Sequence, residues 1–574
     1  MLPPETYITN QYQNQTVAYF SMEVALESAV PTYSGGLGVL AGDTLRAAAD
    51  AGFPMVGMTL LYRKGYFRQV IDAEGLQHEE PVEWDPGERV HETNIRVTIQ
   101  IQGRPVVLKV WRYSVLGVRN HSVPVFLLDA DLPENDEWSR TLTNSLYADG
   151  STYRLAQEMV LGIGGVAALR ALGYRRPSAY HMNEGHSALL SVALMEEMVA
   201  ARGDTEATPD DLAGVRSRCV FTTHTPVPAG HDVFSGDMAR QFLGEGRPAW
   251  KMIESSFIEG SLNMTALALH CSRYVNGVAM RHAQVSRSMF PQYAINSITN
   301  GVHAGTWVSD PLQRLYDEYV PEWRRDNQYL RYALDIPIVE IERAHGEAKQ
   351  DLIDVVAERN GVNLNPSVCT IVFARRATPY KRLGLLFSNP DRLAKIAHRR
   401  PVQIVLSGKA APTDYGGRDS IKHVHEMAET LRGCVTVTYL ADYDMDLARI
   451  LCAGADVWLN TPQKPYEASG TSGMKAAMNG VPSLSVLDGW WIEGHVEWFT
   501  GWAIGGAEST SDPSADAEAL YRKLESAVLP MFYDRAKDFA SMRRSTIALN
   551  GSFFTSQRMV DQYIKNAYAT ADLR

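Results

Sequence analysis

Short apolar segments alternate along the chain with longer stretches in which apolar residues recur with helical periodicity. Short apolar runs bounded by polar residues are typical of strands buried on both faces, and the periodic stretches predict helices. Their regular alternation indicates an α/β protein built on parallel sheets. The predicted strands are Val17–Phe20, Val123–Leu128, Cys219–Thr222, Cys369–Phe373, Val402–Leu406, Val435–Tyr439 and Val457–Leu459, and the predicted helices are Thr44–Ala51, Tyr153–Leu172, Leu189–Ala200, Ile338–Glu358 and Ala515–Ala527.

One segment departs from this alternation. From Ile95 to Val110 apolar and polar residues alternate singly around Gln102-Gly103-Arg104-Pro105, which predicts an antiparallel hairpin. A break at Ser309-Asp310-Pro311 separates two series of strands. We therefore expect two Rossmann-like domains, residues 1–310 and 311–550, that face a central cleft.

Length and charge narrow the classes of function. A chain of 574 residues is too long for one hydrophobic core, and its formal net charge of −11 argues against nucleic acid or a membrane surface as partner. No apolar run approaches the about 20 residues of a membrane helix, and Met1–Thr6 lacks the features of a secretory signal, so we expect a cytoplasmic protein. The cysteines are far apart and predict buried, reduced thiols: Cys219, Cys271, Cys369, Cys434 and Cys452.

The segment Glu467–Lys475 gathers a carboxylate, hydroxyls, glycines and a lysine. Helix-favouring Ala476–Met478 follows, so the glycines should lie just before a helix N-terminus, which attracts phosphate. Lys475 would lie in the first helical turn, where a cation is disfavoured and the amine pKa should fall. A neutral amine is what covalent attachment of an aldehyde cofactor requires. A glycine-rich turn with an exposed lysine is the alternative interpretation.

Two other loops follow predicted strands. Tyr33–Gly38 contains Gly-Gly-Leu-Gly before a helix expected near Asp43; such glycines let the backbone approach a phosphate or sugar, although a plain turn also explains them. Arg375–Arg382 places cations at the carboxyl end of a strand, where α/β sheets bind ligands. Arginine and lysine there suit a phosphate, and a solvated surface cluster is the alternative.

Three histidine-containing segments also follow strands or come late in the first domain: Asn183–His186, Thr223–Pro226 and Thr299–His303. A histidine at such a place is often a structural hydrogen-bonding group, but three of them indicate a polar cleft. Their spacing is not that of a metal site, so we expect no metal.

Taken together, these segments resemble the α-glucan phosphorylases, the family of glycogen, starch and maltodextrin phosphorylases. The resemblance rests on Glu467–Thr471 followed by Met474-Lys475, then Asn479-Gly480 and Asp488-Gly489, and it extends from about Val17 to about Glu493. Ser407–Pro412 resembles the family's Gly-Lys-Ala-Ala-Pro turn. The resemblance implies a GT-B-type glycosyltransferase architecture, in which a final helix, 551–574, packs back toward the first domain.

In this family the lysine that matches Lys475 carries pyridoxal 5′-phosphate. The resemblance implies a set of cofactor-binding residues: Lys475, Thr471, Ser472, Gly473, Arg375, Tyr443, Asn300 and Gly36. It implies a second set that binds the substrate: Glu467, Ser469, Gly470, His224, Asn300, Leu37 and Glu184. It implies catalytic roles for Arg376, Lys381, His224 and Lys475. For Glu467, a helix N-cap is the alternative role.

The implied reaction is reversible phosphorolysis. Inorganic phosphate takes a glucosyl unit from the non-reducing end of an α-1,4-glucan or maltooligosaccharide and gives α-D-glucose 1-phosphate with retention. The 5′-phosphate of the cofactor acts as the acid–base partner of substrate phosphate, so no pair of catalytic carboxylates is required. A homodimer is also expected.

Two positions depart from the family pattern: Arg375 replaces the usual lysine, and Ala25 stands where larger phosphorylases carry a tyrosine. About 16 residues precede the first strand, so we expect activity without phosphorylation or AMP. Two other functions stay open. A nucleotide-sugar-dependent glucosyltransferase of the glycogen synthase type would share the glycine loop but would need no lysine at position 475. A catalytically inactive glucan-binding protein is disfavoured by intact Lys475, Arg376 and Lys381.

Overall fold

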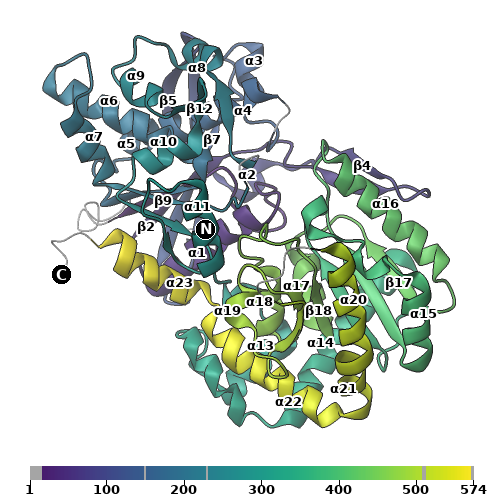
Figure 1. The fold of residues 1–574 in the computed structure, drawn as a ribbon. Helices are drawn as coiled ribbons and strands as arrows, with labels where there is room; N and C mark the ends of the chain where they lie inside the picture. The colour runs from purple at the N-terminus through teal and green to yellow at the C-terminus, as the bar shows by residue number, and fades with distance from the viewer. Residues whose placement is uncertain (1–15, 148–149, 228–229, 507–511, 570–574) are drawn as a thin grey trace.

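The computed structural model describes residues 16–147, 150–227, 230–506 and 512–569, which form two large sheets covered by helices (Figure 1). The first sheet has nine strands in the order β14-β13-β9-β8-β1-β2-β7-β6-β5. Neighbours from β14 to β7 are parallel, and β6 and β5 continue the sheet in antiparallel order. Its strands are β1 (Val17–Ser21), β2 (Met55–Leu60), β5 (His91–Ile101), β6 (Arg104–Leu116), β7 (Ser122–Asp129), β8 (Ala179–Asn183), β9 (Cys219–Thr222), β13 (Tyr274–Gly277) and β14 (Asn296–Ser297).

The second sheet has six parallel strands in the order β17-β16-β15-β18-β19-β20. Its strands are β15 (Cys369–Ala374), β16 (Val402–Ser407), β17 (Thr436–Leu440), β18 (Val457–Asn460), β19 (Ser483–Val486) and β20 (Gly501–Ile504). Two small antiparallel sheets complete the strands: β3 (Arg68–Ile71) with β4 (Gln77–Glu80), and β10 (Val233–Ser235) with β12 (Ser261–Asn263) and β11 (Phe257–Ile258).

Helices cover both faces of each large sheet. Around the first sheet lie α1 (Gly36–Ala51), α4 (Ser151–Met159), α5 (Gly165–Ala171), α6 (Leu190–Arg202), α7 (Pro209–Arg216), α8 (Gly236–Leu243), α10 (Met264–His270) and α11 (Met280–Met289). Later in the chain come α13 (Asp310–Tyr319), α14 (Ile338–Asn360), α15 (Pro390–Arg399), α16 (Tyr415–Thr430), α17 (Met445–Gly454), α18 (Ser472–Met478), α20 (Pro513–Lys523), α21 (Leu529–Asp534), α22 (Ala536–Thr546) and α23 (Ser556–Tyr563). The shorter helices are α2 (Pro86–Arg89), α3 (Glu137–Arg140), α9 (Trp250–Glu254), α12 (Ala304–Trp307) and α19 (Trp491–Gly494). Among the described residues, no helix is long and apolar enough to cross a bilayer.

The central strands explain why the sequence reads as continuous apolar runs. In β1, Ala18 and Phe20 pack in the core on the side of α4–α6, whereas Val17 and Tyr19 pack in the core that includes α1. Successive side chains of a strand point to opposite faces, so a strand covered on both faces must be apolar throughout. The predicted α/β class with parallel sheets is confirmed, and each predicted strand coincides with an observed one.

Two local predictions are wrong. The helix expected near Asp43 begins at Gly36, because its glycines form the first turns of α1 and allow close packing. A Cβ atom on Gly42 would lie 2.1 Å from the carbonyl oxygen of Ala25. Cys434 is exposed, although the cysteines in the described residues are all unpaired as expected.

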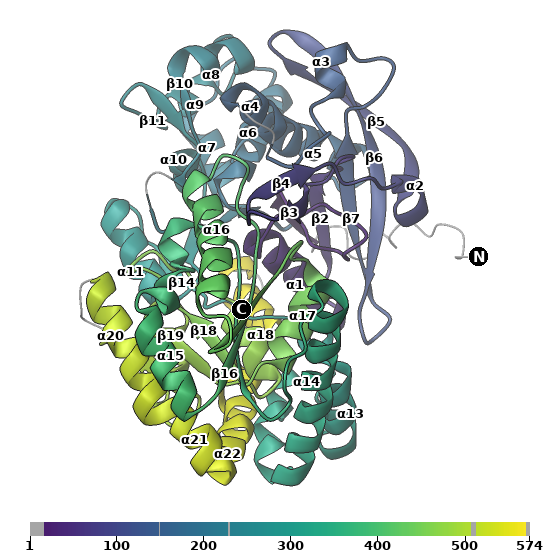
Figure 2. The same cartoon turned by 90° about the vertical axis from the view of Figure 1, so that its right-hand side faces the viewer.

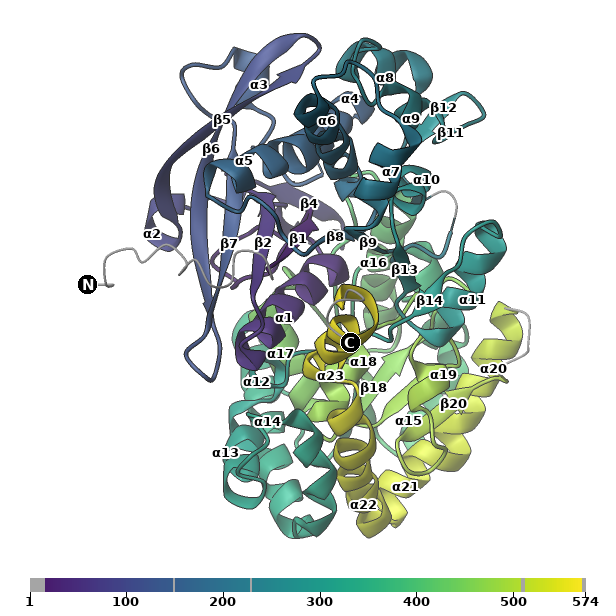
Figure 3. The ribbon, with the colours of Figure 1, turned by 90° about the vertical axis from the view of Figure 1, so that its left-hand side faces the viewer.

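The chain returns to the first sheet at its end. Helix α23 lies beside α1 (Figure 3), and a π-helical turn, Ile564–Tyr568, follows it. Hydrogen bonds join the Tyr568 hydroxyl to Nδ1 of His181 at 2.6 Å and the Tyr563 hydroxyl to Oγ1 of Thr222 at 3.0 Å. Nη1 of Arg558 donates to the carbonyl oxygen of Thr299 at 2.6 Å. Residues 570–574 of the expected C-terminal helix lie outside the described residues, and the boundary near residue 310 stays a prediction.

A second contact joins the two sheets near α19. The carboxylate of Glu493 accepts from the backbone N–H of Met280 at 2.9 Å and from the Thr299 hydroxyl at 2.7 Å. Glu493 follows β19 of the second sheet, whereas Met280 and Thr299 follow strands of the first sheet. These contacts and those of α23 therefore lie at the same edge of the molecule.

A buried cluster of charges fixes the second sheet to its helices. Asp456, just before β18, accepts from Nζ of Lys349 at 2.6 Å, Nη2 of Arg543 at 2.7 Å and Nε2 of His345 at 3.1 Å. Lys349 and His345 lie on α14, and Arg543 lies on α22. Although burial opposes it, these three neighbours hold the pKa of Asp456 well below its usual range.

Replacing this carboxylate should therefore be costly. We expect Asp456→Asn to destabilise the protein by about 3 kcal/mol, because the buried cations Lys349 and Arg543 lose the carboxylate that they share, and Arg543 keeps only Glu342. The midpoint of thermal unfolding at pH 7 should fall by roughly 10 °C. The contribution should shrink as pH falls below the unfolded-state carboxyl pKa of about 4, since the unfolded chain then binds a proton that the native carboxylate, with its lowered pKa, does not bind. Asp354→Asn on the exposed side of α14 is the control, and equal midpoints for the two variants would contradict the role of Asp456.

Candidate active site

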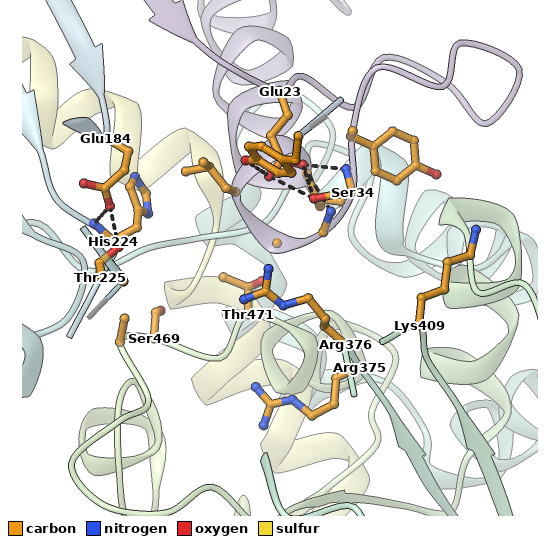
Figure 4. A pocket seen from close by; sticks show the side chains of 18 of the residues that line it. Glu23, Ser34, Glu184, His224, Thr225, Arg375, Arg376, Lys409, Ser469 and Thr471 are labelled. Carbon is orange, nitrogen blue, oxygen red and sulfur yellow. Dashed lines mark hydrogen bonds between the residues drawn. The ribbon is translucent and has the colours of Figure 1, made fainter. Parts of the chain in front are cut away.

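A cavity of about 770 Å³ lies at the carboxyl ends of strands from both large sheets. Loops that follow β1, β8, β9 and β13 line it from the first sheet, and loops that follow β15, β16, β17 and β18 line it from the second. Figure 4 shows Glu184 and His224 on one side of this cavity and Arg375, Arg376 and Lys409 on the other. Open α/β sheets bind their ligands at this end of the strands.

The glycine-rich segment is held in the cavity wall by Glu23. Its Oε2 atom accepts from the backbone N–H groups of Ser34 at 2.6 Å and Gly35 at 3.1 Å, and its Oε1 atom accepts from the Tyr147 hydroxyl at 2.7 Å. Glu23 is buried, and the contacts place Gly36 and Leu37 at the cavity surface. The first turn of α1 thus presents its backbone to the cavity.

A polar group on the first sheet surrounds His224. Glu184, at a left-handed φ of 78°, accepts through Oε2 from the backbone N–H of His224 at 2.7 Å and from the Thr225 hydroxyl at 3.0 Å. A non-glycine residue held in this region of φ carries strain that is typical of functional sites. The resulting geometry turns the ring of His224 toward Asn183, with 2.7 Å between Nε2 and Oδ1.

The hydrogen bonds of Asn183 define the tautomer of His224. The Ser21 hydroxyl donates to the carbonyl oxygen of Glu23, so it accepts from Nδ2 of Asn183 at 3.0 Å. Oδ1 of Asn183 is then the acceptor that faces His224, whose Nε2 must carry the proton. Burial lowers the pKa of His224 to about 4, although Glu184 opposes this shift. His224 is therefore neutral near pH 7 and keeps Nδ1 as an acceptor.

The basic loop after β15 divides into paired and unpaired cations. Glu467 accepts from Nη2 of Arg375 at 2.6 Å and from Nζ of Lys381 at 2.7 Å. Nε and Nη1 of Arg375 are buried without a hydrogen-bond partner in the described part of the chain. Arg376 projects into the cavity, and its guanidinium has no hydrogen bond or ion pair among the residues the structure describes. Arg376 is thus an available cation, whereas Lys381 already has a counterion.

Glu467 is not a helix N-cap, because the N-cap of α18 is Thr471. Its backbone N–H donates to Oδ2 of Asp488 at 3.0 Å, which fixes the loop that continues to Ser469 and Gly470. Both of its carboxylate oxygens face the cations of the basic loop.

Lys475 lies in α18 with its Nζ atom 3.5 Å from the centre of the Trp307 ring. Trp307 is fixed in turn, since its indole N–H donates to Oδ2 of Asp43 at 2.8 Å. Burial lowers the pKa of Lys475, while Cys452 and Asp43 oppose the shift. The lowered pKa was expected, but the largest cause is burial and not the helix dipole. Nζ makes no hydrogen bond or ion pair within the described ranges.

Most of the other expected site residues also line the cavity: Thr471, Ser472, Tyr443, Asn300, Ser469 and Gly470. Oδ1 of Asn300 and Oγ of Ser469 are buried without a hydrogen-bond partner in the described residues. Gly473 is not among the residues that line the cavity, and its place in the cofactor site stays a prediction. A Cβ atom there would lie 2.7 Å from the Trp490 ring, so this glycine allows α18 to pack against Trp490.

A charged group at the first-sheet side of the cavity was not predicted from the sequence. Asp232 accepts from Nη2 of Arg154 at 3.0 Å and lies 3.0 Å from Nε2 of His186. Glu158, one turn after Arg154 on α4, is buried, and burial raises its pKa well above the usual value. The charged residues Arg154 and Glu158 within the otherwise apolar predicted helix 153–172 could have indicated this group from the sequence. Asp232 lies just before β10 in a segment with no such pattern.

The comparison with known proteins agrees with this geometry. A sequence profile of the family described as "Carbohydrate phosphorylase" matches residues 231–498. A maltodextrin phosphorylase from Thermococcus litoralis is 36% identical, over the whole of this chain and 73% of that protein. A glycogen phosphorylase from Mycobacterium tuberculosis is 36% identical over 97% of this chain and 71% of its own length. A glycogen phosphorylase from Aquifex aeolicus is 34% identical over 96% of this chain and 86% of its own length.

The matches to these three relatives extend along nearly the whole chain, and they agree with the resemblance carried by Glu467–Lys475 and the basic loop. The chain therefore belongs to the carbohydrate phosphorylase family, with the glycogen and maltodextrin phosphorylases as its relatives.

Proposed function

We propose that the protein catalyses the reversible phosphorolysis of α-1,4-glucans such as glycogen or maltodextrin, with retention, to give α-D-glucose 1-phosphate. One observation carries the proposal: a single cavity contains a buried lysine of lowered pKa, an unpaired arginine and a neutral histidine beside a carboxylate. The names of the relatives favour a phosphorylase over a nucleotide-sugar-dependent transferase.

The residues around Lys475 fit pyridoxal 5′-phosphate. The amine of Lys475 has a lowered pKa and no polar partner in the described part of the chain, as covalent attachment of an aldehyde requires. Buried polar atoms without partners, Nε and Nη1 of Arg375 and Oδ1 of Asn300, also line the cavity and can bind such a group. We propose that Lys475, Thr471, Ser472, Arg375, Tyr443, Asn300 and Gly36 hold the cofactor. When bound, its 5′-phosphate supplies the acid–base partner of substrate phosphate.

The cations of the basic loop would hold the substrate phosphate. Two phosphates placed close together repel each other, and cations around them offset this repulsion. Arg376 projects into the cavity with no counterion among the described residues, so it can bind phosphate without breaking a contact. Lys381 would give up its ion pair with Glu467 and pair with the substrate phosphate instead. Glu467 would then be released to accept from a sugar hydroxyl beside Ser469 and Gly470.

The first-sheet side of the cavity would bind the glucosyl unit. Nδ1 of neutral His224 can accept a hydrogen bond from a sugar hydroxyl, because Nε2 donates to Asn183. Glu184 holds the His224 backbone in place, and Leu37 and Asn300 line the same space. These residues bind and orient the sugar, and the geometry requires no pair of carboxylates.

The finer architecture is part of this proposal. We infer that the two large sheets belong to two Rossmann-like domains of the GT-B type, with the cavity in the cleft between them. A homodimer and a cytoplasmic location stay predictions, which gel filtration and localisation in cells would test.

The proposed cofactor site predicts which lysine is modified. Borohydride reduction of the purified protein, followed by peptide mapping, should place a pyridoxyl group on Lys475, and near-ultraviolet absorbance should change on reduction. Since burial lowers the pKa of Lys475, cofactor uptake should remain efficient near neutral pH. Lys475→Ala should carry no label and show no phosphorolysis. The exposed Lys395→Ala should behave as wild type, and a label on any other lysine would contradict the assignment.

The unpaired arginine predicts a selective loss of phosphate binding. Arg376→Gln should lower kcat/KM for phosphate by about 100-fold, because a hydrogen bond between two charged groups is lost. The KM for maltooligosaccharide should change by less than about threefold, since the sugar is bound from the first sheet. Initial rates of glucose 1-phosphate formation at varied phosphate measure the effect. Arg399→Gln on the exposed side of α15 is the control; a wild-type phosphate KM in Arg376→Gln would refute the role.

A further inference from the structure

The β3–β4 hairpin belongs to the first part of the chain but docks on the second sheet. Figure 1 shows this purple hairpin reaching to α16, and Figure 2 shows β3 and β4 beside α16. At its turn, a Cβ atom on Gly75 would lie 2.7 Å from Cβ of His425 on α16. The tip of the hairpin therefore packs against α16, a helix of the second half of the chain.

Gln69 on β3 pairs with two loops of the second sheet. Its Nε2 atom donates to the carbonyl oxygen of Gly408 at 2.9 Å. Its backbone N–H donates to Oδ1 of Asp442 at 3.0 Å, and its Oε1 atom accepts from the backbone N–H of Asp442 at 2.8 Å. The side chain is only 2% exposed, so these bonds replace water completely.

Gln77 on β4 repeats this pattern one strand away. Nε2 donates to the carbonyl oxygen of Ala410 at 2.9 Å, and Oε1 accepts from the backbone N–H of Ala410 at 3.0 Å. Oε1 also accepts from Nε2 of Gln69 at 2.8 Å, which joins the two glutamines. Gln77 is 1% exposed. The two side-chain amides thus hydrogen-bond to backbone groups of Gly408 and Ala410, and in this way they join the 408–410 turn to the hairpin.

Lys409 strengthens the same junction. Its Nζ atom donates to the carbonyl oxygen of Phe67 at 2.9 Å and lies 2.6 Å from Oδ1 of Asp442. In Figure 4 it lies apart from Arg375 and Arg376. Although Lys409 lines the cavity, its charge is already paired, so it belongs to the junction and not to the available phosphate-binding cations.

The turn held by the glutamines is bonded directly to the basic loop. The backbone N–H of Arg375 donates to the carbonyl oxygen of Ser407 at 3.1 Å, and that of Ala377 donates to the carbonyl oxygen of Lys409 at 2.9 Å. Gly408 lies so close to this loop that a Cβ atom would be 2.0 Å from the carbonyl oxygen of Arg375. A displacement of the turn would therefore move the basic loop.

We propose that Gln69 and Gln77 are positioning residues for phosphate: they hold the Ser407–Pro412 turn, and through it the Arg375–Lys381 loop, at a fixed place relative to the first sheet. The inference rests on the proposed phosphorolysis, because it assigns these cations to phosphate. Phosphate meets the sugar only if cations carried by one sheet stay in register with a sugar bound to the other. A misplacement of about 1 Å can cost about 100-fold in rate.

The glutamines can be removed without leaving a hole. Methionine has nearly the volume of glutamine but cannot form these hydrogen bonds, so Gln69→Met, Gln77→Met and the double variant remove the pairing while keeping the packing. Hydrogen–deuterium exchange should rise about tenfold or more at the amides of Arg375 and Ala377 and across 407–410. The KM for inorganic phosphate should rise about tenfold in each single variant and more in the double variant, whereas the KM for maltooligosaccharide should change less than threefold. Cofactor content should equal that of wild type.

His78→Met on the exposed face of β4 is the matched control and should leave exchange and both KM values unchanged. Wild-type exchange at Arg375 and Ala377 in a folded Gln69→Met/Gln77→Met protein would overturn the inference, as would an unchanged phosphate KM. A uniform rise of exchange, or equal changes in both KM values, would also overturn it, because a merely structural role predicts that result. If the double variant does not fold, the single variants decide by the same measurements.

The exchange experiment also separates this inference from the proposed function. If wild-type protein shows no phosphorolysis, the proposed function and the role toward phosphate both fail, while the exchange data still decide whether the hairpin fixes the basic loop. If wild-type protein is active and exchange in the variants is unchanged, only the inference fails.

Discussion

The floor of the cavity depends on one buried carboxylate, that of Glu467. It joins the loop after β18 to the basic loop after β15 by accepting from Arg375 and Lys381. Buried cations without a counterion would be strongly unfavourable, so this carboxylate allows several of them to share a small space. Burial and the nearby charge of Glu467 raise the pKa of Asp488 to about 6, although it accepts from the Glu467 backbone. The charges at the floor of the cavity are thus balanced between Glu467, in the loop after β18, and Arg375 and Lys381, in the loop after β15.

The same carboxylate explains why Arg376 is the cation of the basic loop that has no ion pair among the described residues. Arg375 and Lys381 satisfy Glu467, and Lys409 satisfies Asp442, whereas Arg376 projects away from all of these carboxylates into the cavity. An anion that enters therefore meets a cation whose charge no carboxylate in the described residues offsets. Under the proposed function, this anion is the substrate phosphate.

Much of the fold could be predicted, because it depends on local patterns. The central strands are apolar runs covered on both faces, and loops at their carboxyl ends carry the polar residues, so Lys475, Arg376 and His224 could be placed near one another. Contacts between distant segments could not be predicted. Trp307 reaches Lys475 only through the packing of α12 against α18, and Asp232 meets Arg154 from an irregular segment. Gln69 and Gln77 look like ordinary polar residues of a hairpin, and only the docked structure shows both of them buried. The glycines Gly38 and Gly473 do allow a close approach, but the approaching groups are the side chains of Glu23 and Tyr33 at Gly38 and the ring of Trp490 at Gly473.

The return of α23 to the first sheet makes the two halves of the chain poor candidates for exchange between relatives. A first half cut after Trp307 would lack the hydroxyls of Tyr563 and Tyr568, which pair with Thr222 and His181 in the interior of the first sheet. A second half alone would expose the apolar face of α23. A chimera that replaces one half should therefore take its last helix from the same parent as its first half.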